Sequence, residues 1–231
     1  SILFHLTNYG LPVWYDRHKM LLGDERDNKN FDEGVKACNY SIIILSANTI
    51  ASECANEEID LIYQRYKQHK MYVFPIFFNI KASQLPEKYC WMKRLVYKEL
   101  TVANDSRSAC NHIICKVTLD ELQKYKIKTI NEYLKLYKNN KAFSYLTELI
   151  DSYCKISDEN HNAQIALLYA GCLYIKEKYN CCLEIPEFYY KGIQRLFEET
   201  RLNLPIDLRE TLIFERLFLL LFNAAIFGYT I

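Results

Sequence analysis

The sequence predicts an α/β domain with a parallel sheet over residues 1–103, followed by an all-α domain over residues 104–231. Two observations lead to this fold class. In the first domain, apolar strand-like runs alternate with helical patterns, which is typical of a parallel sheet. Beyond a polar linker at residues 102–108, almost every segment has the helical period and few breakers interrupt it.

The elements of the first domain follow in the order that such a sheet requires. We expect, in chain order, a helix ending near Gly10, a strand at 11–15, a polar loop at 16–30, a helix at 31–38, a strand at 41–46, a helix at 57–69, and strands at 71–80 and 94–100. The strand at 71–80 is almost continuously apolar, as burial on both faces demands. Pro75 lacks a backbone N–H, and so predicts an end or edge position there.

The second domain is predicted to contain helices at 106–124, 128–138, 141–156, 161–179, 187–201 and 207–227. The longest apolar stretch lies in the last of them, at residues 217–227. It is too short to span a bilayer, which needs roughly 20 residues. On the surface of a monomer it would form a large apolar patch, so we expect it to support self-association. We therefore predict that the second domain senses a signal or mediates oligomerisation.

Composition excludes several classes of protein. The 231 residues are 50% hydrophobic, which is enough for a substantial core. A net charge of +1, from 29 basic and 28 acidic residues, argues against a nucleic acid or an anionic membrane as the main partner. The nine cysteines are scattered and odd in number, and no signal-like start precedes them, so we expect a reducing cytoplasm.

No cofactor or metal site is predicted. The six glycines are far apart, and none has the spacing of a phosphate-binding loop. Cys110, His112 and Cys115 have the residue types of a metal site. On a helix, however, offsets of two and five residues scatter their side chains around the axis.

A carboxylate follows the strand at 41–46 closely. Ser46 ends that strand, and Glu58 lies in the helical segment that comes after a short loop. In α/β folds, ligands bind at the carboxyl ends of the strands. Glu58 is therefore a candidate site residue, and the alternative is a solvated residue in the first helical turn that the helix dipole favours.

Five segments in order resemble a known family, the TIR (Toll/interleukin-1 receptor) domain, and its bacterial members especially. They are Val13-Trp14-Tyr15-Asp16, Leu22-Gly23-Asp24, Ile42-Ile43-Ile44-Leu45-Ser46, Ser52 with Glu58-Ile59, and Phe74-Pro75-Ile76-Phe77-Phe78, with Trp91 and Leu95 resembling a later block. The resemblance covers about residues 1–103. It implies a flavodoxin-like parallel sheet.

The sequence departs from the family pattern at two places. The family's first strand is expected before Ser1, and the chain opens inside what resembles the first helix. Near the glutamate, the family often has tryptophan four residues before it and cysteine three before it. Cys54 and Ala55 stand there instead, which predicts an altered pocket wall.

The resemblance implies an enzyme that cleaves NAD+ at the nicotinamide–ribose bond, with NAD+ as substrate and Glu58 as the catalytic carboxylate. The products would be nicotinamide and ADP-ribose or cyclic ADP-ribose, in bacterial anti-phage defence, and self-association is expected. Trp14, Asp16, Ser46 and Cys54 are the predicted substrate-binding residues. Trp14 at a strand end is placed to stack on a base and Asp16 to order the next loop, while core packing and a turn cap are the alternatives.

Other interpretations stay open. If Cys54 is matched to the family cysteine, the register moves by one and Glu57 becomes the candidate. A non-catalytic module is the main alternative, in which the charged loop at 17–30 recruits another TIR domain. A nucleoside-processing enzyme would also want a carboxylate near a strand end, but its family would not show this order of segments. Fold alone does not separate these functions.

Overall fold

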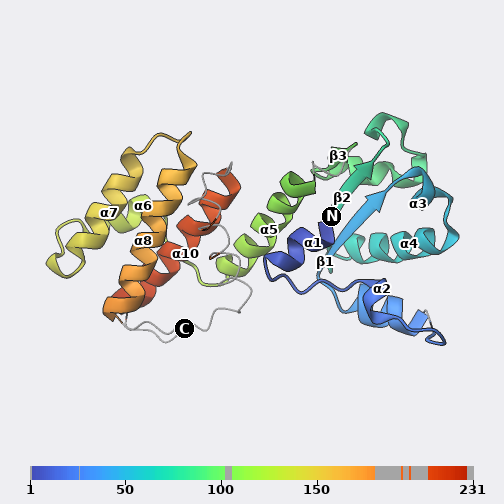
Figure 1. The fold of residues 1–231 in the computed structure, drawn as a ribbon, viewed down its shortest axis with the longest axis horizontal. Coiled ribbons are helices and arrows are strands. Elements are labelled where there is room, and N and C mark those ends of the chain that lie inside the picture. Colours follow the sequence, from blue (N-terminus) through green and yellow to red (C-terminus); the bar gives the residue numbers. More distant parts are fainter. Residues whose placement is uncertain are drawn as a thin grey trace. The chain divides into compact units, whose positions relative to one another are not determined.

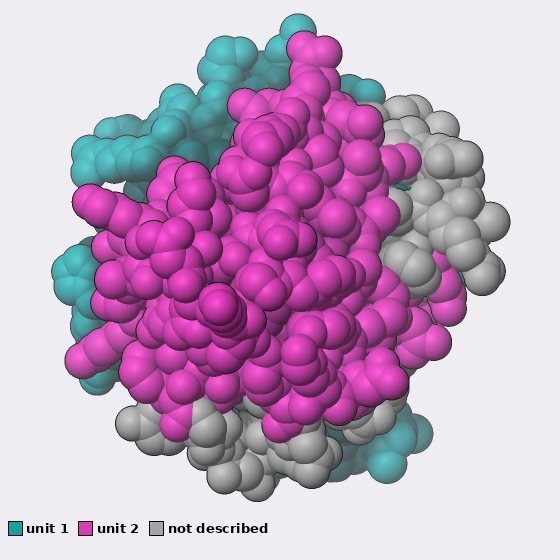
Figure 2. Space-filling model, turned by 90° about the vertical axis from the view of Figure 1, so that its left-hand side faces the viewer, with its two compact units in different colours: residues 1–4, 12–110 teal, residues 5–11, 111–231 magenta. Residues whose placement is uncertain are grey.

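A computed structural model of the chain describes residues 2–25, 27–101, 106–179 and 208–227, together with positions 194 and 198 (Figure 1). The chain forms two compact units, coloured separately in Figure 2. Unit 1 comprises residues 1–4 and 12–110, and unit 2 comprises residues 5–11 and 111–231. The division falls within helix α1 (Ile2–Asn8) and helix α5 (Ser106–Gln123).

Unit 1 contains a parallel sheet of three strands in the order β1-β2-β3. The strands are β1 (Tyr40–Leu45), β2 (Tyr72–Phe78) and β3 (Lys98–Leu100). β1 pairs with β2 in the register Ile43 to Pro75, and β2 pairs with β3 from Ile76 onward. Leu45 and Phe77 are fully buried, whereas Ile44 of β1 and Tyr72 of β2 are exposed, so one face of the described sheet is covered less completely than the other. The predicted fold class, a parallel α/β domain followed by helices, is confirmed.

Short helices surround the sheet in unit 1. They are α2 (Asp16–Lys19), the π-helix η1 (Asp27–Lys36), α3 (Ala47–Ala51), α4 (Glu53–Lys67), and the 3₁₀ helices η2 (Ala82–Gln84) and η3 (Glu87–Arg94). α4 begins four residues earlier than predicted. The cause is Ser52, whose hydroxyl accepts a hydrogen bond from the backbone N–H of Ala55 at 3.3 Å and caps the helix.

Several predicted elements were wrong. Residues 11–15 form no strand of the described sheet, and the ring of Trp14 lies against Gly34 of η1 instead. The predicted loop at 16–30 contains α2 and the start of η1. Of the predicted strand at 94–100 only β3 forms, because Arg94 ends η3 and residues 95–97 belong to neither a helix nor a strand. β2 is the middle strand of the three, so Pro75 is not at an edge. β3 pairs only with residues 76–78, and Pro75 therefore lies just outside that ladder.

The core of unit 1 lies between α4 and the sheet. Ile59 and Ile62 are buried on the face of α4 that its apolar spacing predicted. On the same helix, Tyr63 and Tyr66 stack on Trp91 of η3, with ring centroids 4.6 and 5.3 Å apart. Trp91, which resembled a late block of the family, thus packs η3 against α4 through its ring.

Unit 2 is helical throughout its described part. Besides α5 it contains α6 (Ile130–Tyr137), η5 (Lys141–Phe143), α7 (Ser144–Lys155), α8 (His161–Tyr179) and α10 (Leu208–Phe227). These helices match the predicted ones within a few residues. The predicted helix at 187–201 lies outside the described residues except for positions 194 and 198.

The apolar stretch at 217–227 is not a surface patch, which corrects the sequence prediction. α10 packs along α8, and Leu217, Phe218 and Phe222 are buried in the core of unit 2. Only the end of the stretch, at Phe227, is strongly exposed. The structure therefore removes the argument for self-association through this stretch. None of the helices in the described part of the chain is both long and apolar enough to cross a membrane.

Candidate active site

Glu58 lies in the second turn of α4 and is half-buried. Its carboxylate oxygen Oε1 accepts a hydrogen bond from the side-chain amide of Asn30. The thiol of Cys54, one turn earlier on α4, lies 3.9 Å from the same oxygen. Glu53, not Glu58, occupies the first turn, so the helix dipole does not explain a glutamate at position 58. Its neighbour Glu57 is exposed.

Two N-caps shape the chain between β1 and Glu58. Ser46 caps α3, because its hydroxyl accepts from the backbone N–H of Thr49 at 3.3 Å. The Thr49 hydroxyl in turn donates to the carbonyl oxygen of Ile44 at 3.0 Å, which ties α3 to the end of β1. Ser52 then caps α4 in the same way. The two serine N-caps therefore fix where α3 and α4 begin, and these helices connect β1 to Glu58.

Asn56 connects the end of α3 to the start of α4 through hydrogen bonds. Its side-chain amide donates to the carbonyl oxygens of Ile50 at 3.0 Å and Ser52 at 2.7 Å. Its side-chain oxygen accepts from the hydroxyl of Tyr89, which is buried in the core. The start of α4 is therefore connected to η3 as well as to α3, and this limits the movement of the turn below Glu58.

η1 brings Asn30 to Glu58 from a distant part of the sequence. Asn30 is 5% exposed, and η1 packs against both α2 and α4. On the same helix, a Cβ added to Gly34 would stand 2.9 Å from the ring of Trp14. Since only glycine permits this approach, the indole of Trp14 packs closely on η1 and supports the helix that carries Asn30.

The structure brings only some of the predicted site residues together. Cys54 lies beside Glu58, whereas Trp14 packs on η1, the helix that carries Asn30. The Ser46 hydroxyl is engaged as the cap of α3, and Asp16 is an exposed residue at the start of α2. Sequence reasoning missed Asn30. Asn30 ends the loop at 17–30, which was interpreted as a partner-contact loop, and no pattern in the sequence linked it to Glu58.

The segment before η1 ends in an exposed apolar tip. Leu21 is 78% exposed and Leu22 is fully exposed. Gly23 has a φ of +98°, a conformation that L side chains rarely adopt, and the backbone N–H of Leu21 donates to the carboxylate of Asp24 at 2.9 Å. The predicted partner-contact loop thus presents two leucines on a formed turn.

A family model described as "TIR domain" matches residues 2–114. The chain contains a TIR domain. Glu58, Asn30, Trp14 and the exposed leucines all lie within the matched residues. The resemblance seen in five short segments of the sequence is confirmed by this match.

Several curated proteins resemble part of this TIR domain. The NAD(+) hydrolase TcpC of Escherichia coli O6:H1 is 33% identical over 82 residues, which is 35% of this chain and 26% of TcpC. The 2' cyclic ADP-D-ribose synthase AbTIR of Acinetobacter baumannii is 33% identical over 81 residues, 35% of this chain and 29% of AbTIR.

An archaeal relative, the NAD(+) hydrolase TcpA of a Theionarchaea archaeon, is 26% identical over 80 residues, 35% of this chain and 24% of TcpA. The chain therefore spans between about a quarter and a third of the length of these relatives. No solved structure matches the chain.

Proposed function

We propose that this TIR domain cleaves the nicotinamide–ribose bond of NAD+, with the carboxylate of Glu58 at the reacting centre. The observation that carries the proposal is the setting of Glu58, which is half-buried and held by the buried amide of Asn30. Glu57 is exposed, which favours Glu58 over its neighbour. The names of the relatives, which are NAD(+) hydrolases and 2' cyclic ADP-D-ribose synthases, support the same reaction class.

One carboxylate is sufficient for this chemistry. As the C–N bond breaks, its electron pair goes to the positively charged pyridinium nitrogen, and nicotinamide leaves as a neutral molecule without a general acid. Positive charge develops on the ribose, and a carboxylate beside the anomeric carbon stabilises it, as in glycosidases. The amide of Asn30 donates to Oε1 of Glu58 and so helps to orient the carboxylate toward a bound substrate.

The fate of the ribose cation decides the product. Attack by water forms a new C–O bond, releases a proton and yields ADP-ribose. Attack by a hydroxyl group of the same molecule forms a C–O bond within it, also releases a proton, and yields a cyclic ADP-ribose instead. We extend the proposal to a role in bacterial anti-phage defence, through NAD+ depletion or a cyclic signal, and to self-association of the TIR domain. The family resemblance alone supports this extension.

Nicotinamide release from NAD+ by concentrated protein tests the reaction, with products separated by chromatography. Glu58→Gln preserves the hydrogen-bonding shape of the side chain but removes its charge, and we expect it to slow release roughly a hundredfold or more. Glu57→Gln removes the same charge one residue away and is the matched control. Equal rates in the two variants, or an inactive wild type, would contradict the proposal.

A non-catalytic interaction module is the second candidate, favoured by the exposed leucines of the loop. Leu21 and Leu22 stand in solvent on a turn that Asp24 stabilises. Apolar side chains at a loop tip suit burial against another TIR domain. A Leu22→Asp change separates the candidates. If it abolishes association and nicotinamide release is also absent in the wild type, the module is the better description.

A further inference from the structure

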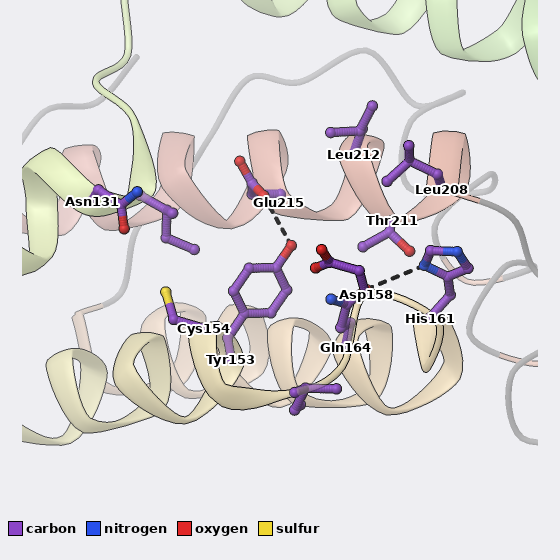
Figure 3. Close-up of a pocket in the computed structure, with 12 residues that line it drawn as sticks. Asn131, Tyr153, Cys154, Asp158, His161, Gln164, Leu208, Thr211, Leu212 and Glu215 are labelled. Carbon is purple, nitrogen blue, oxygen red and sulfur yellow. Dashed lines mark hydrogen bonds between the residues drawn. The ribbon is translucent and has the colours of Figure 1, made fainter.

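Unit 2 contains a pocket that the proposed NAD+ reaction does not use. It has a volume of about 560 Å³ and is lined by α6, α7, α8, α10 and the turn between α7 and α8 (Figure 3). Pockets of a few hundred Å³ with apolar walls and a few convergent polar groups are typical of small-molecule sites. We call it the four-helix pocket.

A buried phenol contacts a carboxylate in the four-helix pocket, and a second carboxylate acts on it more weakly. The hydroxyl of Tyr153 donates a hydrogen bond to Oε2 of Glu215 at 2.9 Å. Burial, then the charge and hydrogen bond of Glu215, and more weakly the charge of Asp158, raise the pKa of Tyr153 above its usual value. Both carboxylates are therefore within electrostatic range of the Tyr153 side chain, which stays protonated and remains a donor.

The negative charge of the pocket is not compensated within it. Its lining contains no lysine or arginine among the described residues. The ion pairs found in the described part of the chain involve neither Glu215 nor Asp158. Glu215 is half-buried, so its charge is less well solvated than it would be on an open surface, whereas Asp158 is exposed. Such a lining attracts a cation and repels an anion.

Thr211 gives a second, independent indication of a ligand. This residue of α10 is 2% exposed, and among the described residues its hydroxyl oxygen has no hydrogen-bond partner. Its side chain extends from α10 toward Asp158, Gln164 and His161 (Figure 3). A buried hydroxyl without a partner costs free energy, and a bound polar molecule or a bridging water in the pocket would supply that partner.

We propose that the four-helix pocket binds a small organic amine, with its ammonium group at the carboxylates of Glu215 and Asp158 and its hydrocarbon part against the apolar walls. Ile130 of α6 and Leu212 of α10 supply such walls. The Tyr153 ring offers a face on which an alkylammonium group binds favourably. The proposal is independent of the NAD+ reaction, and it assigns a chemical class of ligand to the helical part of the chain.

Calorimetric titration of the full chain tests the proposal with probes that differ in charge. Phenethylamine is positively charged, phenethyl alcohol is neutral with nearly the same shape, and phenylacetate is negatively charged. Spermidine serves as a longer amine. We expect the two amines to bind with dissociation constants of about 1 mM or below, and the neutral and anionic probes to bind at least tenfold more weakly.

Variants locate the binding. Glu215→Gln keeps an acceptor for Tyr153 but removes the charge, and we expect it to weaken phenethylamine binding about tenfold, as loss of a charged hydrogen bond does. Glu148→Gln removes the same charge from the exposed face of α7, outside the pocket, and is expected to leave binding within about twofold of wild type. Equal binding by all variants, tighter binding of phenylacetate, or no amine binding up to about 10 mM would each overturn the proposal.

Discussion

The side-chain amide of Asn30 donates a hydrogen bond to the carboxylate of Glu58 across 28 residues of sequence. The donor is buried on η1 and the acceptor is half-buried on α4. The pair joins the segment before the sheet to the helix after β1. This contact helps to orient Glu58, and it leads to the first prediction.

Changing Asn30 is expected to lower NAD+ turnover without changing the residue that acts on the substrate. Asn30→Ala removes the donor, and we expect kcat to fall roughly tenfold while KM changes less. Asn30→Asp places a second carboxylate beside Glu58, which raises the proton affinity of the pair. The acid limb of the pH–rate profile is then expected to move to higher pH.

Initial rates measured from acidic to neutral pH check this prediction. Unfolding midpoints of both variants serve as the control, because a structural role alone lowers stability without moving the pH profile. An acid limb that stays in place in Asn30→Asp would show that the contact does not tune Glu58.

Gly34→Ala is expected to destabilise unit 1. The added Cβ would stand 2.9 Å from the Trp14 ring, a distance that real Cβ contacts essentially never show. Overpacking of this kind costs about 1–3 kcal/mol, which exceeds the gain of ~1 kcal/mol that alanine brings to an open helical position. Urea unfolding followed by circular dichroism measures the loss.

The double variant Gly34→Ala with Trp14→Leu tests whether the close contact with Trp14 causes the loss of stability. Leucine is smaller than tryptophan, so we expect the two changes together to cost less than the sum of their separate effects. Strict additivity would mean that Trp14 is not what the new methyl group meets.

Gly171→Ala is expected to weaken the packing of α8 against α10. A Cβ there would lie 2.6 Å from the ring of Phe218 and 3.1 Å from a methyl group of Leu149. Both neighbours are buried in the core of unit 2, so neither side chain has open space into which to move. We expect a thermal midpoint several degrees lower, measured by calorimetry. Recovery on adding Phe218→Leu would confirm the cause, and a higher midpoint in Gly171→Ala would contradict it.

Alkylation of the cysteines is expected to follow burial. Burial raises the pKa of the Cys110 thiol to about 11 and raises the pKa of Cys172 further. A raised pKa means less thiolate at a given pH, and thiolate is the reactive form. Near pH ~8, iodoacetamide should therefore modify exposed Cys154 well before Cys110 and Cys172.

Peptide mapping by mass spectrometry follows each cysteine separately. The rate at Cys110 should keep rising with pH up to about 11, the pKa of its thiol. In urea the differences between cysteines should disappear, because unfolding removes the burial that causes them. Fast labelling of Cys172 in the native chain would contradict its position in the core.

Local patterns in the sequence were enough to place most elements. Continuous apolar runs predicted β1 and β2, although Ile44 and Tyr72 show that the burial expected on both faces is incomplete. Helical spacing predicted the described helices of unit 2, and Ile59 and Ile62 lie on the buried face of α4 as that spacing required. The start of α4 was placed too late, because the capping hydroxyl of Ser52 was overlooked.

What a side chain contacts was decided by the tertiary structure. Patterns along the chain were sufficient to predict the fold class and the order of β1, β2 and β3, and they made Glu58 the candidate carboxylate. Only the fold paired Asn30 with Glu58, laid Trp14 against Gly34 instead of in a strand, and buried the apolar stretch of α10 against α8. The physical reason is that periodicity records how much burial a segment needs, whereas the partner that satisfies this need comes from residues far away in the sequence.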